Sequence, residues 1–142
     1  MTEISFYTFA ADRLEVARRL AAKAWSQGHQ VMLYAPDATI AHAIDQLLWT
    51  TPALGFVPHC RDDDALAAET PVLIGTNADA LARADVLINL HHEWPSAFAR
   101  FERVLEIVSE DAADREQARL RYRFYQARGY ALHTHDLRPS AG

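Results

Sequence analysis

The sequence predicts a Rossmann-like α/β domain with three layers, in which helices flank a largely parallel central sheet. Two observations carry this prediction. Short apolar runs alternate along the chain with segments of helical periodicity, as strands and crossover helices do in such folds. Several of these runs are apolar at nearly every position, which is typical of parallel strands buried on both faces. The 142 residues suffice for one such domain.

The first half of the chain alternates strands with helices. Residues 4–9 alternate and are rich in β formers, which predicts a strand. Residues 12–27 carry Leu and Ala at helical spacing, and Gly28 ends that helix. Residues 30–34 form a nearly continuous apolar run, which predicts a buried strand. A second helix is predicted over residues 36–48, because Ile, Ala and Leu side chains recur on one face.

The second half adds more strands and one long helix. The strand pattern recurs in four segments, namely residues 71–75, 85–90, 103–108 and 130–134. Residues 61–70 form an acidic connection that could hold one helical turn, and residues 95–101 predict another turn. A helix capped by Asp111 runs to Arg128, and Gly129 ends it. We expect one domain over residues 1–137.

Composition and charge exclude several classes of protein. The chain is 50% hydrophobic, which excludes global disorder. It has no apolar run approaching the ~20 residues of a membrane span, and its N-terminus lacks the pattern of a signal peptide. Cys60 is the only cysteine, so the expected compartment is the reducing cytoplasm. The net charge of −5 argues against a general nucleic-acid binder. The last residues, 138–142, are expected to be a disordered tail.

Neither a nucleotide cofactor nor a metal is expected. The turn after the first strand, residues 9–13, has no glycine, and its aspartate would repel a phosphate. His91 and His92 follow a strand, and His59 and Cys60 form a second pair of possible ligands. Neighbouring residues on a strand face opposite sides, and neither pair has a zinc-site spacing. We therefore predict no catalytic residue and no metal ligand.

Residues 49–58 combine large apolar side chains with two prolines and a glycine. Neither helical nor strand periodicity runs through them, which predicts a loop or sheet edge. Large apolar groups such as Trp49 and Phe56 on a stiff surface loop favour a protein-docking patch. The alternative is a loop whose aromatic side chains fold back into the core, the commoner fate of a single Trp.

Residues 115–130 carry five arginines against one glutamate, although the whole chain is acidic. On a helix, Arg115, Arg119, Tyr122 and Arg123 share one face. Guanidinium forks suit carboxylates or phosphates, and Tyr122 offers a flat surface to an apolar group. This face therefore suits an acidic peptide with an apolar anchor. The alternative is a solvated helix whose arginines pair with nearby carboxylates, namely Asp111, Asp114 and Glu116.

These two features, in this order, resemble the chi subunit of bacterial DNA polymerase III. The similarity covers nearly the whole chain, and the segment Phe56-Val57-Pro58-His59 is its most specific piece. The other matching motifs are Phe6-Tyr7, Ala24-Trp25-x-x-Gly28-x-x-Val31, Ala43-x-x-x-Leu47-Leu48-Trp49, Arg119-x-Arg121-Tyr122-Arg123-x-Tyr125 and Gly129-Tyr130.

The resemblance implies a non-enzymatic bridging subunit. The family pairs with the psi subunit, which links it to the clamp loader, and it binds the acidic C-terminal tail of single-stranded DNA-binding protein. Trp49, Phe56 and Pro58 match the positions that contact psi. The tail-binding positions match Arg115, Arg119, Tyr122 and Arg123, although the family often has lysine at the first and last of these. DNA is reached only through these partners, and no membrane is involved.

Two other functions stay open at this point. One is a Rossmann-like nucleotidyl or phosphoryl transferase that uses His91 or His92. The other is a direct single-stranded DNA binder, in which bases stack on Tyr122 beside the arginine face.

Overall fold

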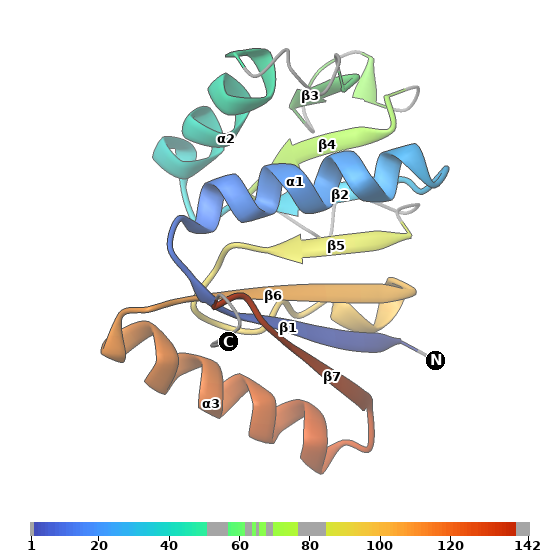
Figure 1. The fold of residues 1–142 in the computed structure, drawn as a ribbon. Coiled ribbons are helices and arrows are strands. Elements are labelled where there is room, and N and C mark those ends of the chain that lie inside the picture. Colours follow the sequence, from blue (N-terminus) through green and yellow to red (C-terminus); the bar gives the residue numbers. More distant parts are fainter. Residues whose placement is uncertain are drawn as a thin grey trace.

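A single sheet of parallel strands organises the chain. The computed structural model describes residues 2–50, 57–61, 64, 66–67, 70–76 and 85–138. Within these ranges seven strands pair in the order β3-β4-β2-β5-β6-β1-β7, and every pairing is parallel (Figure 1). The strands are β1 (Glu3–Ala10), β2 (Val31–Tyr34), β3 (His59–Arg61), β4 (Val72–Gly75), β5 (Val86–Asn89), β6 (Arg103–Ser109) and β7 (Ala131–Asp136). The predicted three-layer α/β fold is confirmed.

Helices cover both faces of this sheet. They are α1 (Arg13–Ser26), α2 (Ala38–Thr50), the 3-10 helix η4 (Phe98–Arg100) and α3 (Ala112–Ala127). One buried cluster joins α1 and α2 to the sheet, and a second joins η4 and α3 to its other face. Neighbouring residues of one strand belong to opposite clusters. Leu87 of β5 is part of the cluster with η4 and α3, and Ile88 is part of the cluster with α1 and α2. This explains why the central strands are apolar at nearly every position, with Asn89 of β5 and Glu106 of β6 as buried exceptions.

The first helix begins with a side-chain cap in the place where many α/β proteins bind phosphate. The Asp12 carboxylate accepts hydrogen bonds from the backbone N–H groups of Leu14 at 3.1 Å and Glu15 at 3.2 Å. These are donors that a phosphate at a helix N-terminus would need. Gly28, with a φ of +86°, turns the chain out of the helix toward β2.

The segment around residues 49–58 differs from its prediction. Helix α2 continues to Thr50, so Trp49 is helical and its assignment to a loop was wrong. Strand β3 was also not predicted, because three residues beside β4 are too few to show a period. Val57 is 4% exposed and packs into the core, while Trp49 is 58% exposed. Residues 51–56 lie outside the described ranges, as do 77–84 and 139–142 of the predicted tail.

Candidate functional site

A groove opens between helix α3 and the edge of the sheet formed by β1 and β7. Helix α3 supplies one wall, and the last residues of β1, β6 and β7 supply the other. The lining residues are Phe6, Thr8, Phe9, Val108, Arg115, Ala118, Arg119, Tyr122, Thr134 and Asp136.

The groove has a volume of about 360 Å³, which is enough for one or two side chains of a peptide. Its floor is mostly apolar and aromatic. The Tyr122 ring packs against Phe6, with 5.4 Å between the ring centroids, and Val108 and Ala118 are buried beside them. Arginine side chains stand at the rim, so the groove combines an apolar floor with a positively charged edge.

Three of the four residues predicted for the acidic partner meet in this groove. Arg115, Arg119 and Tyr122 all line it. Arg123 is exposed on the same helix but is not among the lining residues described. The guanidinium of Arg119 lies 3.5 Å from the Glu116 carboxylate, and both side chains are more than half exposed, so this pair is weak. The predicted alternative of pairing within the helix thus holds for Arg119.

The strand side of the groove was missed by sequence reasoning. Phe9, Thr134 and Asp136 line it because β7 pairs in parallel with β1 beside α3. No pattern in the sequence shows which strand lies next to β1. The sequence gives no sign that Phe9 belongs to a site, because an aromatic residue is ordinary in the predicted strand over residues 4–9.

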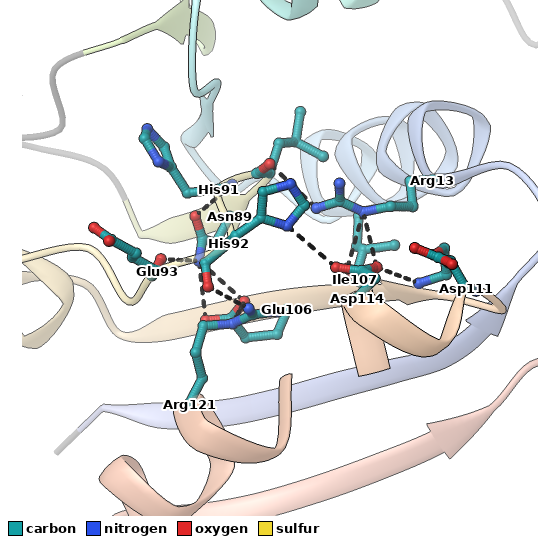
Figure 2. Close-up of polar contacts among 12 residues, drawn as sticks. Arg13, Asn89, His91, His92, Glu93, Glu106, Ile107, Asp111, Asp114 and Arg121 are labelled. Carbon is teal, nitrogen blue, oxygen red and sulfur yellow. Dashed lines mark hydrogen bonds and ion pairs between the residues drawn. The ribbon is translucent and has the colours of Figure 1, made fainter. Parts of the chain in front are cut away.

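Arg121 belongs to a buried polar network and not to the surface charge of α3 (Figure 2). Its side chain is 1% exposed, and its Nε donates to Oε1 of Glu106 at 3.0 Å. Asn89 Nδ2 and the Tyr125 hydroxyl also donate to this carboxylate, at 3.0 and 2.8 Å. Of the five arginines counted in residues 115–130, Arg121 is therefore buried, which leaves four to act at the surface.

This network fixes α3 against the sheet. Arg121 Nη1 also donates to the His92 carbonyl oxygen at 2.6 Å, which ties the helix to the segment that follows β5. Burial raises the pKa of Glu106, and the donors around it, led by Arg121, act in the opposite direction. The sequence motif containing Arg121 is thus a positioning element, which holds Arg119 and Tyr122 over the groove.

Asp114 connects the start of α3 to helix α1 and to the segment after β5. Its carboxylate accepts a hydrogen bond from the Ser109 backbone N–H at 2.7 Å and lies 3.8 Å from the Arg13 guanidinium. His92 Nδ1 approaches it to 3.3 Å. Burial alone would raise the pKa of Asp114, but the Ser109 hydrogen bond and the Arg13 charge together lower it. The alternative of pairing with the arginine face of α3 is therefore not what the structure shows for Asp114, whose ion-pair partners are Arg13 and His92.

We expect Asp114→Asn to lower the free energy of unfolding at pH 7 by on the order of 1 kcal/mol. The carboxylate has a lowered pKa in the folded state, so its contribution is present above the unfolded pKa of about 3.9 and is lost as pH falls through the folded value. Urea unfolding of the wild type and of Asp114→Asn at pH 7 and pH 3 measures this difference in unfolding free energy. The difference between the two proteins should be smaller at pH 3, and an unchanged difference would contradict the prediction.

A second surface lies at the opposite edge of the sheet, where α2 ends beside β3. The Trp49 ring meets the His59 ring at an interplanar angle of 67°, with 5.1 Å between the centroids. His59 is buried, with Nδ1 2.7 Å from the Val57 carbonyl oxygen and Nε2 3.3 Å from the Asp45 carboxylate. Pro58 is partly exposed next to it. Phe56, the third residue predicted for this patch, lies outside the described ranges.

The remaining candidate residues have structural neighbours of their own. His91 stacks on Tyr34, with 4.4 Å between the rings, and the two histidines of this pair point to different partners. Among the residues described, no group of three or more His, Cys, Asp or Glu side chains is placed to hold a metal ion. None of the described helices is both long and apolar enough to cross a membrane.

Comparison with known proteins gives one consistent result. The family model described as "DNA polymerase III chi subunit, HolC" matches residues 1–133. A relative from Pseudomonas aeruginosa, named DNA polymerase III subunit chi, is 41% identical over 96% of this chain and 98% of its own length. Proteins of the same name are 34% identical over 87% of this chain in Haemophilus influenzae and 30% identical over 81% in Escherichia coli. These two matches cover 86% and 79% of the respective relatives.

Proposed function

Because the chain belongs to the DNA polymerase III chi subunit family, and so is a replication accessory subunit, we propose that it is a non-catalytic bridge. One end binds the psi subunit of the clamp loader. The other binds the acidic C-terminal tail of single-stranded DNA-binding protein. The observation that carries the proposal is the groove whose rim holds Arg115 and Arg119 over an apolar floor. Such a bridge acts in the cytoplasm.

The groove has the chemistry that an acidic tail with a terminal phenylalanine requires. Carboxylates of the tail meet the guanidinium groups of Arg115 and Arg119, and the aromatic ring enters the space beside Tyr122. Arg123, outside the groove, adds charge to the approach of the tail. Exposed ion pairs contribute about 0.2–1 kcal/mol each, so an isolated tail binds with micromolar affinity in order of magnitude. Several tails on one oligomer raise the affinity by avidity.

The psi contact is assigned to the patch of Trp49, Phe56 and Pro58. An exposed Trp is the kind of anchor that fills a pocket in a partner and dominates the binding energy. The described residues of this patch, Trp49 and Pro58, adjoin β3, and the groove adjoins β7, at the two ends of the strand order (Figure 1). The separation supports simultaneous binding of both partners, which a bridge requires.

A titration with a labelled acidic peptide ending in Pro-Phe tests the tail contact. We expect saturable binding that weakens at higher salt and disappears when the terminal Phe is removed. Arg119→Ala should weaken binding by about two- to fivefold, the equivalent of one exposed ion pair. Arg100→Ala, which removes an exposed arginine outside the groove, is the matched control and should bind like the unaltered protein.

The same titration distinguishes the alternatives. A folded protein that does not bind the peptide would contradict the proposal. If a bare single-stranded oligonucleotide displaced the peptide at comparable concentration, the groove would be a direct DNA site. The net charge of −5 favours the peptide, since the rest of the chain repels a polyanion.

A further inference from the structure

The strand-side wall of the groove contains an unusual backbone conformation. Phe9 has a φ of 59°, the left-handed region that a bulky residue rarely adopts. The pairing of β1 with β6 shifts register between Tyr7 and Ala10, so the strand is irregular at this position. Such conformations persist when the surrounding structure holds them, and they gather at functional sites. Here the irregular strand end directs the Phe9 ring into the lining of the groove.

Two guanidinium groups lie over this ring. Arg115 of α3 has its Cζ atom 4.9 Å from the centroid of Phe9, and Arg138 has its Cζ atom 3.8 Å away. The chain carrying Arg138 is held at this place, since the Leu137 N–H donates to the Thr8 carbonyl oxygen at 3.0 Å. Phe9 therefore connects the arginine of α3 with an arginine that follows β7.

Arg138 is already paired with a carboxylate of the groove. Its Nε lies 3.1 Å from both oxygens of Asp136, and its Nη2 lies 2.6 Å from Oδ2. Asp136 lines the groove, and both side chains are about half exposed, at 46% for Asp136 and 57% for Arg138. An exposed pair of this kind is weak, so another carboxylate can replace Asp136 at little cost.

We propose that Phe9 and Arg138 form the strand-side half of the peptide site. The Phe9 ring packs against the terminal aromatic side chain of the acidic tail, and Arg138 exchanges Asp136 for a tail carboxylate. The inference rests on the proposed function and adds two specificity-determining residues to it. Asp136 acts as an internal competitor, because its negative charge occupies Arg138 and repels an acidic peptide.

The test measures binding of the acidic peptide ending in Pro-Phe to the full chain and its variants. We expect Arg138→Ala to weaken binding by about two- to fivefold and to reduce its salt dependence. Asp136→Asn should strengthen binding by a similar factor. Phe9→Ala should weaken binding by about fivefold or more, with little further loss when the peptide lacks its terminal Phe.

Controls keep this inference separate from the proposed function. Arg119→Ala and Arg100→Ala are measured in the same series, and circular dichroism confirms that each variant is folded. If the wild type binds and Arg119→Ala weakens binding while the Phe9 and Arg138 variants bind normally, only this inference is overturned. Weaker binding by Asp136→Asn would also overturn it, since the pair would then be needed intact. If Phe9→Ala does not fold, the inference is judged on the peptide affinities of Arg138→Ala and Asp136→Asn. Absence of wild-type binding would overturn the proposed function itself.

Discussion

Replacing Arg121 by methionine is expected to lower the free energy of unfolding by about 3–5 kcal/mol. The substitution removes the cation beside Glu106, which is fully buried and keeps only the hydrogen bonds from Asn89 and Tyr125. A buried carboxylate without a counter-charge is costly, and a methionine of similar length leaves little cavity. Urea unfolding at pH 7, followed by far-ultraviolet circular dichroism, measures the loss.

The pH dependence of this loss identifies its cause. Burial already raises the pKa of Glu106, and removal of Arg121, which opposes that effect, should raise it further. A carboxyl group with a raised folded pKa contributes full stability below its unfolded pKa of about 4.3 and loses it as pH rises through the folded value. The deficit of Arg121→Met should therefore be smaller at pH 4 than at pH 7.

A second substitution provides the matched control. Glu106→Gln in the Arg121→Met background removes the buried charge, and we expect it to restore part of the lost stability. If the double variant is as unstable as the sum of the two single variants, the charge pair is not the source of the loss. The Arg121 variant should also bind the acidic peptide less well, because the network holds α3 over the groove.

Arg121 also marks the boundary of what the sequence can predict. Helical spacing correctly places Arg115, Arg119 and Tyr122 together, since the side-chain directions of a regular helix are known in advance. Spacing does not show what faces the other side of the helix. A signal for the burial of Arg121 was nevertheless present, because Glu106 interrupts an otherwise apolar strand and a buried carboxylate requires a partner.

The fold was predictable for a related reason. Central strands such as β4 and β5 are buried on both faces, so they appear in the sequence as runs of consecutive apolar residues. Strand β3 is only three residues long and lies at an edge of the sheet. Strand β7, which pairs with β1, comes more than 100 residues later in the sequence, so local patterns do not show this pairing. The strand side of the groove, with Phe9 and Asp136, depends on that neighbour and could not be predicted. Helix α2 extends to Thr50, which places Trp49 on a rigid element rather than a loop.

Replacing Trp49 by alanine is expected to weaken psi binding by at least 2 kcal/mol, or about thirtyfold. The side chain is 58% exposed at the end of α2, so its loss should change the stability of the free protein little. Its ring also meets His59 edge-on, and this contact fixes the direction in which the indole points. Isothermal titration of purified psi into each variant measures the affinity.

Trp94→Ala is the matched control, since Trp94 is 41% exposed but stacks on Phe124 of α3, far along the strand order from β3. It should bind psi normally. Arg119→Ala should likewise retain psi binding, and Trp49→Ala should retain binding of the acidic peptide. Loss of both partners in a folded Trp49→Ala protein would contradict separate surfaces, because the two sites would then depend on each other. Loss of psi binding alone, with peptide binding retained, would support two separate surfaces.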